Sequence, residues 1–374
     1  MTGFPQYPPP PPQPPSQMRL GLWGPPNSGK TTFLAALPLA ALRSQRLHGD
    51  GAWTVSGADD DTTNFILDSI HHLTDLKTFP LATEQHRSLM FDIAVDRTIL
   101  HQPEPVKRGW SLRGGVQQAP IPATVTERFF LDVLDVPGRS YDRQDPPPTS
   151  AAANGNGGDP FDFDDGPDDS GHPYEDDDYD VPGSSEDELL DHLQMCQGIL
   201  FLFDPGRDAR QGDAFRFMYP VLEKLAQRVK AGGYSGARLP HRIAVCVTKL
   251  DDPFVYKTAY QGGFLTRDYR PPFAPTVPDE RAPDFFARLC RSNGRTNSDL
   301  VLQGLNNFFY PHNIRFFVTS SVGFHIPNGM FKAKDPFNVW RGQADGKLKV
   351  RGTVSPINVL EPLIWLHESL RDQQ

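Results

Sequence analysis

Cysteine is scarce in this chain, and long hydrophobic runs are absent. The three cysteines among 374 residues, Cys196, Cys246 and Cys290, form no C-x-x-C pair and are too few for a disulfide framework. We expect each to be a small buried side chain in a protein whose thiols stay reduced. No stretch reaches the roughly 18 apolar residues of a membrane span, and residues 1–17 lack the features of a secretory signal. These absences predict a cytoplasmic protein.

A strong excess of basic residues is missing as well. The formal net charge is -9, but 16 acidic residues and only one basic residue, Arg143, lie between Tyr141 and Glu188. The remainder of the chain holds 36 basic and 30 acidic residues and is therefore only mildly basic. Nucleic-acid binders usually carry a much stronger cationic footprint, so a nucleic-acid partner is not expected.

Proline is abundant but unevenly distributed. Eight of the 38 prolines lie in residues 1–17, a leader that predicts extended polyproline II, either unstructured or a docking peptide for an aromatic groove. The segment at about 144–184 alternates Pro, Gly, Asn and acidic runs, and it is too polar to offset the entropy of ordering. An irregular, proline-rich insertion is expected at about 252–284. The remaining residues suffice for one large α/β domain or two small ones.

Short apolar runs alternate with helical periods along the rest of the chain. Strands are predicted at 19–23, 88–95, 128–134, 198–203, 242–247 and 314–318, and helices at 30–43, 62–74, 185–196, 218–229, 300–309 and 355–370. Strands separated by helices predict an α/β fold with a mostly parallel sheet covered on both sides. In such folds, ligands bind at the carboxyl ends of the strands.

One glycine-rich motif stands between a predicted strand and a predicted helix. Residues 24–31 read GPPNSGKT and satisfy the pattern G-x-x-x-x-G-K-[ST]. Main-chain N–H groups at a helix N-terminus favour phosphate, a lysine neutralises it, and a hydroxyl can hold Mg²⁺. The candidate phosphate-binding residues are Gly24, Asn27, Ser28, Gly29, Lys30, Thr31 and Thr32, with Thr31 also a magnesium ligand.

Three further motifs follow the ends of later strands. Asp135 opens DVPG, where a carboxylate can hold Mg²⁺ and the Gly138 N–H can approach a γ-phosphate. The sequence TKLD follows IAVCV, and its Asp251 carboxylate can accept hydrogen bonds from guanine N1–H and the 2-amino group. The stem of Lys249 can cover the purine. The main-chain N–H groups of Ser320, Ser321 and Val322 follow the strand RFFV and can meet guanine O6.

Taken in this order, the four motifs resemble those of the P-loop GTPases, specifically the translation-factor-related class called TRAFAC. GPPNSGKT is similar to the phosphate loop of that family, DVPG to its D-x-x-G switch II motif, TKLD to its [NT]KxD base-reading motif, and TSSV to its weaker last motif. FPLAT and SPINVLEPLIWL further resemble the double-GTPase components of bacterial conflict or regulatory systems. The resemblance implies a three-layer, Ras-like GTPase domain over residues 18–374 that binds GTP or GDP with Mg²⁺.

The resemblance also implies catalytic residues, and the chain departs from the family at three of them. Switch I needs a threonine on Mg²⁺; Thr83 in FPLAT is our choice over Thr62 and Thr63, which are expected to cap a helix. Thr248 stands where asparagine is common in the base-reading motif. Arg139 stands where many members have the glutamine that orients the attacking water, and it is either an arginine finger or a switch residue paired with the acidic insertion.

The implied function is a guanine-nucleotide switch that hydrolyses GTP slowly, with Lys30, Thr83, Gly138 and Arg139 as its catalytic residues. Its partners would be unidentified protein effectors or regulators, including a second GTPase. Because the acidic insertion directly follows switch II, nucleotide state is hypothesised to alter how residues 144–184 are presented to a partner; the alternative is a passive solubilising loop. Two alternatives stay open: a nucleotide-binding scaffold without hydrolysis, suggested by Arg139, and a P-loop ATPase, which TKLD disfavours.

Overall fold

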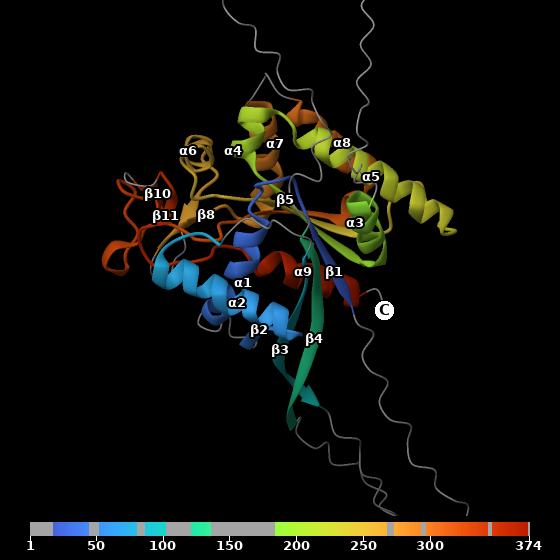
Figure 1. Ribbon diagram of the computed structural model, residues 1–374, viewed down its shortest axis with the longest axis horizontal. Coiled ribbons are helices and arrows are strands. Elements are labelled where there is room, and N and C mark those ends of the chain that lie inside the picture. Colours follow the sequence, from blue (N-terminus) through green and yellow to red (C-terminus); the bar gives the residue numbers. More distant parts are fainter. Residues whose placement is uncertain are drawn as a thin grey trace, which may run out of the picture.

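A mixed α/β architecture is built around a seven-stranded sheet of order β2-β3-β4-β1-β5-β6-β9 (Figure 1). The computed structural model describes residues 18–44, 52–80, 87–101, 121–135, 184–267, 273–292, 297–342 and 346–372. The strands of the sheet are β1 (Arg19–Trp23), β2 (Ala52–Gly57), β3 (Arg87–His101), β4 (Ile121–Asp135), β5 (Gly198–Phe203), β6 (Arg242–Val247) and β9 (Ile314–Val318). β4, β1, β5, β6 and β9 are parallel, whereas β2 and β3 join antiparallel at one edge. The predicted mostly parallel sheet is therefore confirmed.

Helices pack on both faces of this sheet because its central strands are apolar on both. In GILFLF, the side chains of Ile199, Phe201 and Phe203 enter one core cluster and those of Leu200 and Leu202 enter the other. The helices are α1 (Lys30–Ser44), α2 (Asp60–His71), α3 (Ser184–Met195), α4 (Pro205–Gln211), α5 (Ala214–Ala231), α6 (Pro253–Gln261), α7 (Ala282–Ser292), α8 (Ser298–Phe308) and α9 (Glu361–Arg371). No helix in the described part of the chain combines the length and apolar character needed to cross a bilayer.

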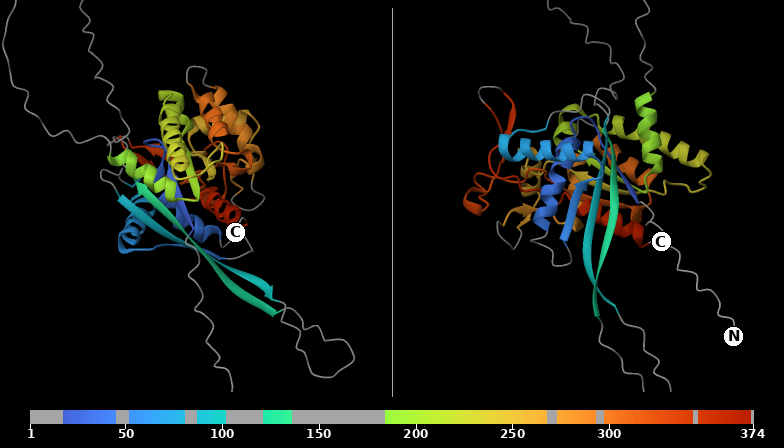
Figure 2. Two further views of the ribbon diagram at one scale, coloured as in Figure 1. Left: turned by 90° about the vertical axis from the view of Figure 1, so that its right-hand side faces the viewer. Right: turned by 60° about the horizontal axis from the view of Figure 1, so that its bottom comes forward.

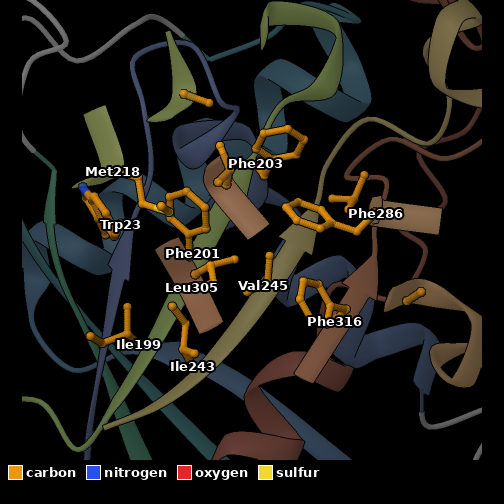
Figure 3. Close-up of a cluster of buried hydrophobic side chains, with 14 of the residues drawn as sticks. Trp23, Ile199, Phe201, Phe203, Met218, Ile243, Val245, Phe286, Leu305 and Phe316 are labelled. Carbon is orange, nitrogen blue, oxygen red and sulfur yellow. The ribbon is translucent and has the colours of Figure 1, made fainter. Parts of the chain in front are cut away.

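The two core clusters define which helices cover which face. Side chains of α3, α5, α7 and α8 meet the first cluster, where the rings of Trp23 and Phe201 lie 4.8 Å apart and Met218 and Leu305 pack nearby (Figure 3). Side chains of α1, α2 and α9 form the second cluster, with Phe33 and Leu363 fully buried. Burial of this kind is the main favourable contribution to folding, and it holds the carboxyl ends of the strands in place.

Strands β3 and β4 form a hairpin that is longer than predicted. Their register runs without a break from the pair Arg87–Asp135 to the pair His101–Ile121. Figure 2 shows the outer part of this hairpin projecting beyond the body of the molecule. Because Arg87 opposes Asp135, the chain enters β3 and leaves β4 at the same end of the hairpin, the end that holds the carboxyl terminus of β4.

Several differences from the sequence predictions concern short elements. The edge strand β2 was not expected. The region 252–284, expected to be irregular, contains α6, the start of α7, and a two-stranded sheet of β7 (Thr266–Arg267) and β8 (Pro275–Thr276). The last helix begins at Glu361 rather than near residue 355, and Pro362 lies in its first turn, where proline is tolerated. The leader 1–17 and the acidic insertion up to residue 183 lie outside the described residues.

Candidate functional site

The loop between β1 and α1 has the backbone of a tight cradle. Asn27 and Gly29 have positive φ angles of 58° and 95°, and the Ser28 N–H donates to the Pro25 carbonyl at 3.1 Å. A Cβ atom at Gly24 would lie 2.6 Å from the Leu202 carbonyl oxygen, so only glycine fits this approach to β5. The glycines of GPPNSGKT are therefore explained by the backbone itself.

The lysine of this loop turns back over the loop. Lys30 Nζ donates to the carbonyl oxygens of Gly24 at 2.9 Å and Pro25 at 3.1 Å. Thr31 and Thr32 follow in the first turn of α1, which contains no acidic residue. Helix geometry leaves first-turn N–H groups without a helical acceptor, and the helix dipole adds positive charge there. Lys30 and the start of α1 thus place positive charge at this loop.

Two hydrogen bonds join this loop to the TKLD segment after β6. The Thr248 hydroxyl lies 3.1 Å from the Ser28 carbonyl and 3.2 Å from the Phe203 carbonyl. Lys249, whose φ is 61°, donates from Nζ to the Asn27 carbonyl at 3.1 Å. Residues more than two hundred positions apart in the sequence are therefore held side by side.

Asp204, at the end of β5, completes this junction and was missed by the sequence analysis. Its Oδ2 lies 2.6 Å from Lys249 Nζ, and its side chain is 3% exposed against 41% for the lysine. Its Oδ1 accepts from the N–H groups of Gly206 and Arg207 and so caps α4. The available signal was an aspartate followed by proline directly after GILFLF, which is typical of a helix start.

The carboxylate of Asp251 is buried and held by a serine from the segment after β9. The Ser320 hydroxyl donates to Asp251 Oδ1 and accepts from the Gly323 N–H at 2.8 Å. Burial raises the pKa of Asp251 to about 6, although the Ser320 hydrogen bond acts in the opposite direction. At neutral pH this carboxylate is therefore charged, close to the point where it gains a proton.

The segment Ser320–Val322 differs in part from its predicted role. The Ser320 N–H donates to the Ile357 carbonyl at 3.0 Å, so this amide is used within the protein. Ser320 meets the site through its hydroxyl instead. Val322 is buried in a small apolar cluster with Ala35 and Leu73, while Ser321 is partly exposed.

The remaining predicted residues fall at the edge of the described region. Thr83, Gly138 and Arg139 lie outside the described residues, and Asp135 is described only through its backbone at the end of β4. Of the rival threonines, Thr62 is fully buried with its hydroxyl accepting from the Met90 N–H at 2.9 Å. The Thr63 hydroxyl donates to the Asp59 carbonyl. Both have structural roles in α2, whose N-cap is Asp59 rather than either threonine.

The described residues therefore bring together three of the four motifs. The phosphate-type loop, TKLD and Ser320 meet at the carboxyl ends of β1, β6 and β9 through the Ser28–Thr248, Asn27–Lys249 and Asp251–Ser320 contacts. Within these residues, no group of three or more His, Cys, Asp or Glu side chains is arranged to hold a metal ion.

Neither a protein-family model nor a curated protein sequence matches the chain. Among solved structures, the chain is similar to the signal recognition particle receptor SRb-GTP/SRX complex from Chaetomium thermophilum. The likeness has 14% sequence identity and a TM-score of 0.31, and it covers 83% of this chain and 93% of that chain. This likeness is distant, and the interpretation of the site rests on the site's own hydrogen bonds and ion pair.

Proposed function

We propose that the protein binds guanine nucleotides with Mg²⁺ and hydrolyses GTP slowly as a molecular switch, in the manner of a P-loop GTPase of Ras-like fold. The observation that carries this proposal is the pair of contacts by which Thr248 and Lys249 join the loop Gly24–Thr31 to the segment bearing Asp251. A phosphate cradle alone fits any nucleoside triphosphate. A cradle fastened to a buried, charged carboxylate fits a nucleotide whose base offers hydrogen-bond donors.

The phosphates would be bound by the main chain and by Lys30. The main-chain amides of Asn27 and of Gly29 to Thr32 lie at the N-terminal end of α1, where anions are favoured, whereas the Ser28 N–H already donates to the Pro25 carbonyl. To meet a β- or γ-phosphate, the Lys30 ammonium would exchange its contacts with the Gly24 and Pro25 carbonyls for phosphate oxygens. The carbonyl contacts keep the charge near the loop before a ligand arrives.

The base would be read by Asp251. Guanine N1–H and its 2-amino group are two donors that a single carboxylate can accept, and adenine has no equivalent pair. Ser320 orients the carboxylate, while Asp204 holds Lys249 so that its stem can lie over the purine. Guanine is selected over adenine because bound adenine would leave the buried carboxylate without hydrogen-bond donors.

The residues present fit a magnesium ion bound with the phosphates. Mg²⁺ commonly takes one or two protein ligands together with phosphate oxygens and water, so a cluster of several carboxylates is not required. Thr31, in the first turn of α1, would supply a hydroxyl ligand, and Asp135 ends β4 beside β1. Thr83 as the switch I ligand, and Gly138 and Arg139 in switch II, remain predictions.

Binding selectivity tests the proposal directly. Calorimetry with the full chain and Mg²⁺ is expected to show binding of GTP and GDP, with no competition by excess ATP. Asp251→Asn should transfer preference from guanine to xanthine nucleotides, because an amide can donate to the xanthine 2-oxo group. Asp252→Asn, one position further, is the matched control and should leave preference unchanged. Equal binding of ATP and GTP, or no heat with either, contradicts the proposal.

Phosphate release separates the switch from the scaffold alternative. A switch is expected to release about one phosphate per bound GTP in a single turnover. The release should be slow, because Arg139 stands where many family members have the glutamine that orients the attacking water. Stoichiometric binding without phosphate release would favour the scaffold. If Arg139→Ala leaves the single-turnover rate unchanged, the arginine-finger interpretation is wrong while the binding proposal stands.

A further inference from the structure

A small two-stranded sheet beyond β9 carries positive charge on one face. It consists of β10 (Val339–Arg341) and β11 (Leu348–Val350), with Trp340 opposite Lys349 and Val339 opposite Val350. Because side chains alternate along a strand, Lys347, Lys349 and Arg351 share one face with Trp340. The opposite face carries Val339, Arg341, Leu348 and Val350, of which Val350 is 2% exposed and packs with Leu73 and Val322. We call Lys347, Lys349, Arg351 and Trp340 the basic face.

The basic face extends onto the loop that precedes β10. The Asp335 carboxylate accepts from Arg351 Nη1 at 2.6 Å and Nη2 at 3.1 Å, which fastens this loop to β11. Lys332 and Lys334, on either side of Ala333, are exposed there. Residues 327 to 351 contain two acidic residues, Asp335 and Asp345, and six basic ones: Lys332, Lys334, Arg341, Lys347, Lys349 and Arg351.

Exposed apolar side chains accompany this charge. Met330 and Trp340 are 47% and 44% exposed, and Leu348, on the opposite face of β11, is 48% exposed. A surface that combines cations with a half-exposed tryptophan fits a partner with both negative charge and aromatic rings. Figure 1 places β10 and β11 at the end of the molecule opposite to α3 and α5, on the side where α2 and α6 lie.

The chain itself contains a segment of this chemistry. Eleven of the 22 residues from 159 to 180 are acidic, none is Lys or Arg, and Phe161, Phe163, Tyr174 and Tyr179 are interleaved with them. The part from Asp159 to Asp169 holds six of these acids and both phenylalanines. It lies 15 residues before Ser184, where α3 begins, and fifteen extended residues reach about 50 Å. A domain of this size has a diameter of about 50 Å, so this linker reaches the basic face when it is nearly fully extended.

We infer that the basic face binds the acidic–aromatic segment Asp159–Asp169 of the same chain. Tethering favours this occupant over a free polyanion, because a covalent linker that can span the distance raises the local concentration of the segment. Nucleic acid could also meet a cationic face with a tryptophan, but it would have to displace this segment first. The inference goes beyond nucleotide binding and does not depend on it.

Carbodiimide cross-linking, which joins a lysine to a carboxylate in direct contact, tests the inference on the full chain. Cross-links from Lys332 and Lys334 to carboxylates of Asp159–Asp169 are expected in the monomeric fraction, and high salt should suppress them. Lys347→Glu combined with Lys349→Glu should lower their yield about tenfold, because two attractions become repulsions. The matched control, Lys230→Glu with Lys257→Glu, reverses two exposed lysines elsewhere and should leave the yield unchanged.

A second variant keeps the test independent of any change in β11. Converting the six aspartates of Asp159–Asp169 to asparagine leaves the basic face intact, and it should raise affinity for a short single-stranded oligonucleotide about tenfold by removing the competitor. Equal oligonucleotide binding by this variant and the wild type overturns the inference. So do cross-links found only between isotopically light and heavy chains in a mixture, since they would place the segment on a second copy.

Discussion

Replacing the buried carboxylate of Asp251 should stabilise the nucleotide-free protein in a pH-dependent way. Burial raises the pKa of this group from 3.8 to about 6. The folded protein therefore holds the proton more tightly than the unfolded chain does. Stability from this group is fully present below pH 3.8 and is lost as the pH rises through about 6. Asp251→Asn keeps an acceptor for the Ser320 hydroxyl but removes the charge.

The size of the effect follows from the shift. About two pKa units at about 1.4 kcal/mol each correspond to about 3 kcal/mol. At neutral pH, Asp251→Asn should thus unfold at higher urea concentration than the wild type, by up to about 3 kcal/mol in free energy. Near pH 4 the two should be nearly equal. The residue is 6% exposed, so solvent screening reduces this figure little.

Urea unfolding of both proteins without nucleotide, at several values between about pH 4.5 and about pH 7.5, measures this difference. Asp252→Asn provides the control, since Asp252 caps α6 through the Phe254 N–H and asparagine caps equally well. A difference between wild type and Asp251→Asn that stays constant with pH would refute the reasoning. A stabilised variant that no longer binds GTP would show that the carboxylate is kept for ligand binding at the expense of stability.

Three further changes address other parts of the site and core. Asp204→Asn retains the α4 cap but removes the charge beside Lys249, and it should weaken GDP binding roughly tenfold in calorimetry, whereas Asp213→Asn should not. Gly24→Ala should abolish nucleotide binding and destabilise the protein by about 1–3 kcal/mol in urea, because its Cβ meets the Leu202 carbonyl at 2.6 Å. The cysteines are all buried, and burial raises the pKa of Cys196 and Cys290 to about 12. Native protein should therefore resist a thiol reagent that modifies all three in urea; rapid reaction without denaturant would contradict their burial.

The central elements could be predicted because their signals are local. GILFLF is apolar at every position, and a strand buried on both faces requires that pattern; its observed bounds agree with the prediction. The glycines of GPPNSGKT likewise mark positions where a close main-chain contact or a positive φ angle favours glycine. The outer half of the β3–β4 hairpin had no such signal. It projects from the body, so its pairing depends on main-chain hydrogen bonds rather than on alternating burial.

The contacts within the site could be predicted only in part. Placing TKLD near the loop follows from the parallel order of β1 and β6, since carboxyl ends of parallel strands share an edge. The ion pair between Asp204 and Lys249 joins residues 45 positions apart, and only the folded chain shows it. The same holds for Ser320, whose hydroxyl rather than amide reaches the site because its N–H pairs with Ile357.

The long connection between β4 and α3 affects how freely the sequence of this protein can change. Residues 136–183, 48 in number, separate two elements that both pack beside β1. Loop-closure entropy grows only with the logarithm of length, so shortening this connection to about eight residues would save about 1.5 kcal/mol. The fold therefore places little constraint on how long or how acidic the connection is. The length and the acidic content of the connection can therefore change to suit the surface that the connection binds.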